Sequence, residues 1–142
     1  MKIKCLFFLF MILMLSAGTL YGDCRFYRYS DNKQIFYTQD RMIRNYSDNN
    51  RLYYLNEDGY ICRYSDNKKL YYMEDDHIRR YSDNKRLFYF KDNYLCRYSD
   101  NQKLYKIEDN KIIRYSDNRQ LYYYRGFEYK MLVFMMLSLV EF

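Results

Sequence analysis

The sequence predicts an all-β protein of six 17-residue β-hairpin repeats, forming a β-meander or a hairpin solenoid of about twelve short antiparallel strands. The tetrapeptide Tyr-Ser-Asp-Asn recurs at intervals of 17 or 18 residues, starting at Tyr29, Tyr46, Tyr64, Tyr81, Tyr98 and Tyr115. The chain also contains 21 tyrosines and no proline, whereas disordered chains are poor in aromatic residues. We therefore expect an ordered repeat array.

The first 22 residues have the pattern of an export signal. Lys2 and Lys4 precede an apolar run from Cys5 to Ala17, and small or neutral residues follow as far as Gly22. The apolar run is shorter than the roughly 20 residues that a membrane-spanning helix needs. We expect cleavage after Gly22 and a secreted, periplasmic or cell-envelope location for the remainder. A retained N-terminal anchor is the alternative.

Each repeat contains two short runs that are typical of β-strands, such as "KLYYM" (69–73) and "HIRRYS" (77–82). Runs of five or six residues are too short to form stable helices. Turn-forming sequences such as "SDNK", "EDD" and "NEDG" bound these runs, and Asp and Asn form turns without needing glycine. Residues 23–130 are therefore predicted to alternate between strand and turn.

The two faces of the predicted hairpins both contain aromatic and basic side chains. Alternate strand residues share a face, so a turn at 66–68 would divide the third repeat into two sets, Cys62, Tyr64, Leu70 and Tyr72 against Ile61, Arg63, Tyr71 and Met73. An ordinary half-buried sheet would alternate more cleanly. The pattern suits a wound stack of hairpins or a single-layer sheet with ladders of rings and cations on both faces.

The cysteines bear on these two arrangements. Cys62 and Cys96 occupy the same position in repeats two apart. In a flat meander they would be about 19 Å apart, whereas a disulfide requires Cα atoms within roughly 7 Å. Only a tightly wound stack could bring them together. Because Cys24 makes an odd number after the export signal, we expect free thiols.

Residues 131–142 break the repeat with the apolar run "MLVFMMLSLV" (131–140). Ten residues cannot span a bilayer as a helix. We expect a last strand or short helix that covers the open end of the array, because repeat arrays need atypical end units. The alternative is contact with a membrane or a partner through an exposed apolar patch.

The sequence suggests no catalytic or metal-binding group. His77 is the only histidine and lies beside a turn containing Asp75 and Asp76, where we expect it on the surface. The repeated Ser-Asp pair is interpreted as a turn former. Each repeat carries both charge signs, which predicts a mixed surface instead of the concentrated basic face typical of nucleic-acid binding. We therefore predict no enzyme activity, no cofactor and no nucleic-acid partner.

Pairs of aromatic residues recur at one phase of the repeat. A tyrosine combines a flat apolar body with a polar tip, which suits wet contact surfaces, although the same rows could instead stabilise the sheet through cross-strand pairs. The predicted ligand-binding residues are Tyr53, Tyr54, Tyr71, Tyr72, Phe88, Tyr89, Tyr122 and Tyr123.

The segment "LYYLNEDGYI" (52–61) resembles the core of choline-binding, cell-wall-binding hairpin repeats. The Trp-Tyr-Tyr position of that family falls on Leu52-Tyr53-Tyr54 and on Leu70-Tyr71-Tyr72, and its Gly-Trp position on Arg63-Tyr64 and Arg80-Tyr81. "YSDNKKL" is also similar to the core of variant MORN hairpin repeats. Both resemblances imply a stack or meander of hairpins with a binding or scaffold role and no catalysis.

The resulting hypothesis is an exported, non-catalytic binding or structural module. It would present its tyrosine rows to a glycan or a protein at the cell envelope. The alternative is a structural or partner-binding repeat protein that acts through the apolar C-terminal segment, with membrane contact by that segment.

Overall fold

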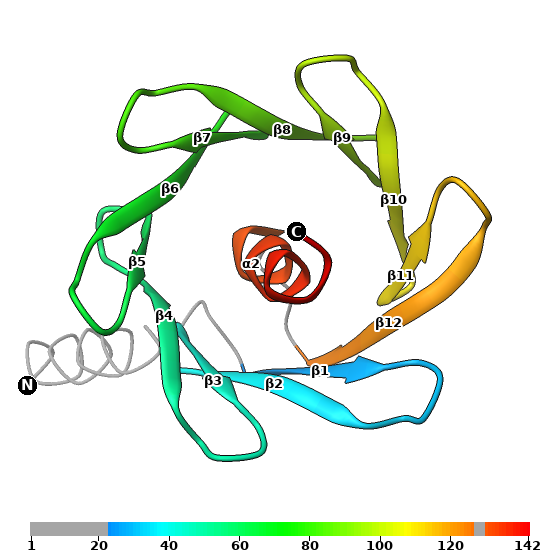
Figure 1. The fold of residues 1–142 in the computed structure, drawn as a ribbon, viewed down its shortest axis with the longest axis horizontal. Helices are drawn as coiled ribbons and strands as arrows, with labels where there is room; N and C mark the ends of the chain where they lie inside the picture. The colour runs from blue at the N-terminus through cyan, green and yellow to red at the C-terminus, as the bar shows by residue number, and fades with distance from the viewer. Residues whose placement is uncertain (1–22, 127–129) are drawn as a thin grey trace, which may run out of the picture.

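The computed structural model describes residues 23–126 and 130–142, which form a twelve-stranded antiparallel barrel closed around one helix (Figure 1). The predicted export signal lies outside the described residues. The helix is α2 (Lys130–Glu141). The strands are β1 (Cys24–Arg28), β2 (Gln34–Gln39), β3 (Met42–Asn45), β4 (Arg51–Leu55), β5 (Tyr60–Arg63), β6 (Lys69–Glu74), β7 (His77–Arg80), β8 (Arg86–Lys91), β9 (Tyr94–Arg97), β10 (Lys103–Glu108), β11 (Lys111–Arg114) and β12 (Arg119–Gly126).

The prediction of an all-β hairpin meander with twelve short strands is confirmed, and the meander closes on itself. Every strand pairs with its neighbour in the sequence, and β1 also pairs with β12. At this seam the rings of Tyr27 and Tyr123 stack with centroids 4.9 Å apart, and the Tyr29 amide donates to the Leu121 carbonyl at 2.8 Å. Closure pairs the two edges that an open sheet would leave exposed.

A recurring β-bulge shapes the wall. In the third repeat Ile61 pairs with Tyr71 but Cys62 pairs with Lys69, so Leu70 is an extra residue. The register shifts at the same place in the other hairpins that Tyr-Ser-Asp-Asn joins. Bulges increase local twist and bend the strand, which helps a sheet of short strands to curl into a barrel.

The inner face of the wall contains the residues that strict alternation predicts for the third repeat. The buried core includes Ile61, and both Tyr71 and Met73 pack against it. Arg63 lies on the same face, as expected, because it pairs directly with the core-packed Tyr53; its side chain is partly exposed and forms an ion pair with Asp66 at 3.0 Å. Arg63 is the last residue of β5, where the chain leaves the sheet. The inner wall is therefore apolar around the core, and arginines such as Arg63 and Arg80 lie on the same face at the end of the barrel where the Tyr-Ser-Asp-Asn turns begin.

The turns follow the predicted chemistry. The last residue of each Tyr-Ser-Asp-Asn motif has a positive φ, at Asn32, Asn49, Asn67, Asn84, Asn101 and Asn118. At the other end of the barrel, Asp75 and Asp76 both have positive φ (49° and 60°), which is the signature of a two-residue type I′ hairpin. The turns at 40–41, 92–93 and 109–110 share this signature.

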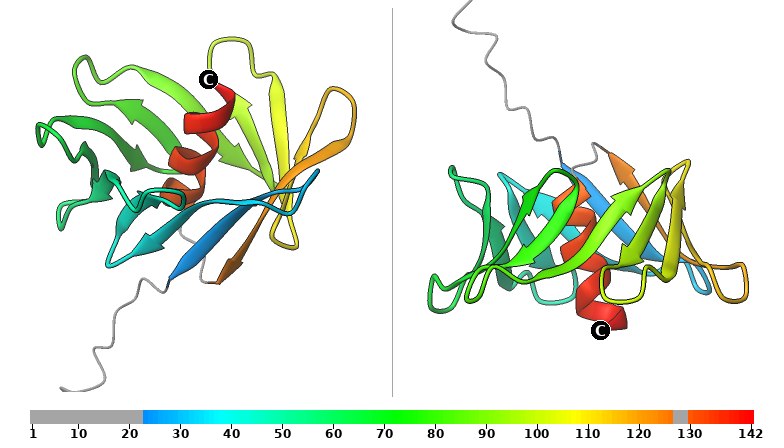
Figure 2. Two further views of the ribbon diagram at one scale, coloured as in Figure 1. Left: turned by 60° about the horizontal axis from the view of Figure 1, so that its bottom comes forward. Right: turned by 90° about the horizontal axis from the view of Figure 1, so that it is seen from above.

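Helix α2 runs through the interior of the barrel (Figures 1 and 2). All seven residues of 131–137 are buried, so this part of the helix has no solvent face, as expected of a helix surrounded by protein. The Phe134 ring lies 5.3 Å from Phe88 and 6.0 Å from Tyr71. The segment thus fills the interior instead of lying across the end of an open array. No helix in the described parts of the chain is long and apolar enough to span a membrane.

The dimensions explain this arrangement. Twelve strands about 4.8 Å apart and tilted by about 40° give a wall radius of about 12 Å. A helix with its side chains is about 10–12 Å wide, so one layer of inward side chains fills the remaining shell. That layer includes one fully buried residue from each odd-numbered strand: Phe26, Ile43, Ile61, Ile78, Leu95 and Ile112.

The barrel keeps Cys62 and Cys96 apart, as expected for a flat arrangement of the hairpins. Cys62 and Cys96 are buried and form no disulfide. They lie on β5 and β9, and the single-layer wall keeps four strand spacings between them.

Candidate functional site

The repeated motif builds one rim of the barrel. We call the six Tyr-Ser-Asp-Asn turns, with the two residues that follow each, the flared rim, because these turns project outward around the barrel (Figures 1 and 2). The turns at 40–41, 56–59, 75–76, 92–93 and 109–110 form the opposite rim. Helix α2 begins at the opposite rim, where Lys130 forms an ion pair with Asp76 at 3.2 Å.

The Asp of the motif and the Arg directly before the motif stabilise five of the six flared turns. Asp83 accepts from the Arg80 guanidinium at 2.9 Å and from the Lys85 amide at 3.1 Å. The Arg80 guanidinium is the main cause of a lowered Asp83 pKa, and Arg114 likewise lowers the pKa of Asp117 to about 2. The ion pair recurs as Arg28–Asp31, Arg63–Asp66, Arg97–Asp100 and Arg114–Asp117.

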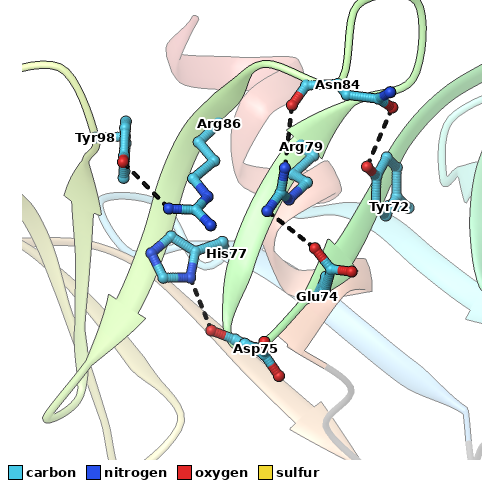
Figure 3. Close-up of polar contacts among 8 residues, drawn as sticks. All are labelled: Tyr72, Glu74, Asp75, His77, Arg79, Asn84, Arg86 and Tyr98. Atoms are coloured by element: carbon cyan, nitrogen blue, oxygen red, sulfur yellow. Dashed lines mark hydrogen bonds and ion pairs between the residues drawn. The ribbon is translucent and has the colours of Figure 1, made fainter.

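The Asn of five of the six motifs connects neighbouring repeats. Tyr72 donates its hydroxyl to Asn84 Oδ1 at 3.2 Å (Figure 3). The same bond joins Tyr37 to Asn49, Tyr54 to Asn67 and Tyr89 to Asn101. Tyr123 donates to Asn32 at 3.4 Å, so the same bond joins the last repeat to the first across the seam. In the fifth repeat Lys106 replaces this tyrosine and pairs with Glu108.

The predicted ligand-binding residues divide between the two faces of the wall, because the members of each pair are consecutive in a strand. The first members, Tyr53, Tyr71, Phe88 and Tyr122, pack against the buried core. The second members, Tyr54, Tyr72, Tyr89 and Tyr123, use their hydroxyls in the bonds to Asn. Burial, followed by interaction with Cys62 and Cys96 respectively, raises the pKa of Tyr54 and of Tyr89. The structure therefore does not bring the eight rings together on one surface.

The most exposed tyrosines are those of the motif itself, each of which directly follows an odd-numbered strand. Their exposed fractions range from 38% at Tyr64 to 55% at Tyr46. Each backbone amide donates to a leucine or isoleucine carbonyl of the neighbouring repeat, as Tyr81 does to Leu70 at 2.8 Å. The main chain is therefore fixed while the ring remains accessible. The predicted ligand-binding residues do not include these tyrosines, although their recurrence in six turns is a signal in the sequence.

Cations lie against several of these rings. The Lys69 ammonium is 4.3 Å from the Tyr60 centroid and 5.3 Å from the Tyr81 centroid, and the two rings are nearly perpendicular, at 85°. Lys103 lies in the same way between Tyr94 and Tyr115. Arg86 packs over Tyr98 and donates to its hydroxyl at 3.2 Å (Figure 3). Exposed contacts of this kind contribute about 0.5–1 kcal/mol each.

Shallow hollows lie between neighbouring repeats of the flared rim. One, of about 540 Å³, is lined in part by Asn49, Arg51 and Tyr64. Another, of about 490 Å³, begins at Tyr29 of the flared rim and extends along the outer wall near the seam to Asp109 and Lys111 at the opposite rim. Each hollow places a tyrosine ring beside polar side chains, which is an arrangement suited to a ligand with apolar faces and hydroxyl groups.

His77 lies on the outer wall, as predicted. Its Nδ1 is 2.8 Å from the Asp75 carbonyl oxygen (Figure 3), and its ring lies edge-on to Tyr98. Within residues 23–126 and 130–142 no three His, Cys, Asp or Glu side chains gather in a way that could hold a metal ion.

The end of α2 is attached to the wall by a carboxylate. Tyr105 donates to Glu141 Oε2 at 2.8 Å and Tyr122 donates to Oε1 at 2.7 Å. Burial, with the hydrogen bond to Glu141, raises the pKa of Tyr122 to about 12 and raises that of Tyr105 further. These bonds fix the position of the helix along the barrel.

Alkaline pH is expected to release this attachment. The folded protein retains the Tyr122 proton at a pH where the unfolded chain, with a tyrosine pKa near 10, has lost it. The contribution to stability is therefore complete below pH of about 10 and is lost as the pH rises toward about 12. Denaturant unfolding across this range should show the decline. The decline in the free energy of unfolding with pH should be shallower in Glu141→Gln. An equally steep decline in that variant would contradict the role of Glu141 in raising the pKa of Tyr122.

No protein-family model, no curated protein and no solved structure matches this chain.

Proposed function

We propose that the protein is an exported, non-catalytic binding module that contacts a glycan at the cell envelope through the tyrosines of the flared rim. The observation that carries this proposal is the ring of six exposed tyrosines, between 38% and 55% exposed, around one end of a rigid barrel. Aromatic rings fixed on rigid elements are suited to recognition because they lose little conformational entropy on binding.

The Asp and Asn of the motif and the Arg before it support the proposal, because most of them have structural partners. The Arg, Asp and Asn side chains of the fourth turn, for example, are all used within the barrel, whereas the Tyr81 ring remains 43% exposed. The alternative function, through the apolar C-terminal segment, would require α2 to leave the barrel, because residues 131–137 are buried there.

Sedimentation with purified, insoluble cell-wall polysaccharide tests the proposal. Replacing Tyr64, Tyr81 and Tyr98 together with alanine should weaken binding at least tenfold, which corresponds to about 1.4 kcal/mol. Truncation of interface aromatics commonly costs that much or more. These rings lie outside the buried core, so the variant should still fold, unlike a variant at the inward-facing Tyr71.

The matched control replaces the exposed serines of the same three turns, Ser65, Ser82 and Ser99, with alanine. This control should bind as the parent protein does. No sedimentation of the parent protein, or equal loss in the control, would contradict glycan binding by the tyrosines. Binding to a purified envelope protein in place of the polysaccharide would identify a protein ligand instead.

A further inference from the structure

The barrel separates its charges by end. The sequence suggested a mixed surface because every repeat carries both signs, but the fold places them on different rims. Cations occupy the first position after the motif in Lys33, Lys68, Lys85 and Arg119, all of them exposed. They occupy the second position in Arg51, Lys69, Arg86 and Lys103. Every turn of the opposite rim contains at least one Asp or Glu.

The flared rim is therefore positive, because its acids are compensated locally. Its carboxylates are the motif aspartates, and five of the six form an ion pair with the arginine three residues earlier. Within the described residues, the cations that follow the motif form no ion pair. Three of them instead lie against tyrosine rings: Lys69, Arg86 and Lys103. A ligand at the rim would therefore meet a cation and an aromatic ring side by side.

The spacing of these groups suits a chain more than a small ligand. Adjacent flared turns are two strands apart, so equivalent residues recur about every 12 Å around the wall. A single sugar or ion would contact one turn, whereas a polymer following the rim would contact several. Linked weak contacts of this kind raise the overall affinity without any new contact at each site.

We propose that the flared rim binds an acidic polysaccharide, with anionic groups at the unpaired cations and sugar faces on the neighbouring tyrosines. This inference rests on the proposed glycan-binding function and specifies its ligand class. A second copy of the chain, docked by its acidic opposite rim, is less favoured because the flared turns extend beyond the barrel wall (Figure 2). The net charge, which is +6 for the full sequence and +4 without Lys2 and Lys4 of the predicted export signal, also makes copies repel one another.

Binding to soluble polygalacturonate, compared with neutral dextran of similar length, tests the proposal by calorimetry. Polygalacturonate should bind at least tenfold more tightly, and its association constant should fall steeply with salt, by about tenfold or more between 50 and 200 mM. Replacing Lys33, Lys68 and Lys85 with glutamine should weaken binding at least tenfold and reduce the salt dependence. Replacing Lys91, an exposed lysine beside the opposite rim, with glutamine should change neither.

Each contrary outcome has a distinct meaning. Equal, salt-independent binding of dextran would overturn the acidic-ligand inference while leaving glycan binding intact. Failure to bind either polymer or cell-wall polysaccharide would overturn both. Tighter binding of a single-stranded oligonucleotide than of polygalacturonate would overturn the polysaccharide class. Reversible self-association that the lysine substitutions abolish would assign the rim to a second copy.

Discussion

Replacing Phe134 with alanine is expected to lower the free energy of unfolding by about 3–5 kcal/mol, which is the usual cost of removing a buried phenylalanine side chain. Phe134 is 2% exposed and contacts rings from two strands of the wall, Tyr71 and Phe88. Because the barrel encloses the helix, a shift of the helix that filled the new cavity would open a second cavity on the opposite side. Denaturant unfolding followed by circular dichroism measures the loss.

Phe142 supplies the matched control for this substitution. It is the same residue type near the end of the same segment, but it is 61% exposed, so Phe142→Ala should cost far less than Phe134→Ala. Equal effects, or a loss below about 1 kcal/mol for Phe134→Ala, would contradict a helix enclosed by the barrel, because an exposed apolar segment tolerates such truncation.

Deleting one whole repeat is expected to unfold the protein or expel the helix. Without residues 75–91 the barrel would have ten strands and a wall radius about 2 Å smaller, which leaves too little room for α2 and its shell of side chains. An open repeat array behaves differently, since its stability is roughly a sum over repeats and neighbouring interfaces. Thermal unfolding and protease sensitivity of residues 130–142 distinguish the two cases.

The control for this deletion keeps the number of hairpins. Residues 75–91 are replaced by a copy of residues 92–108, which has the same length and belongs to the same repeat family. This chain should fold and protect its C-terminal segment. If the shortened chain melted as cooperatively as the parent, within a few degrees, the dependence on six hairpins would be wrong.

The hairpins were predictable from the sequence because their determinants are local. The period of Tyr-Ser-Asp-Asn fixes the spacing of the turns, and Asp-Asp or Asp-Asn pairs supply the positive φ that tight hairpins need. Closure was not predictable, because it depends on the twist and tilt accumulated over twelve strands. Bulges such as the one at Leu70 contribute to that curvature but have no distinct sequence signature here.

The candidate site was only partly predictable for similar reasons. Alternation along a strand separates Tyr71 from Tyr72, but it does not say which of them faces inward until the position of α2 is known. The charge separation arises because the two kinds of turn lie at opposite ends of every hairpin, so a repeat with both signs in sequence becomes a barrel with a basic and an acidic rim.

A cross-link between the first and last strands tests the closed barrel most directly. Tyr27 and Tyr123 are paired across the seam, so Tyr27→Cys with Tyr123→Cys, in a chain whose native cysteines are replaced by alanine, should form an intramolecular disulfide under mild oxidation. The paired residues Tyr60 and Tyr72 of adjacent strands provide the positive control. A closed barrel predicts similar yields for both pairs. Efficient linkage of the control pair without linkage of the seam pair would contradict closure, because an open sheet would hold β1 and β12 about 50 Å apart.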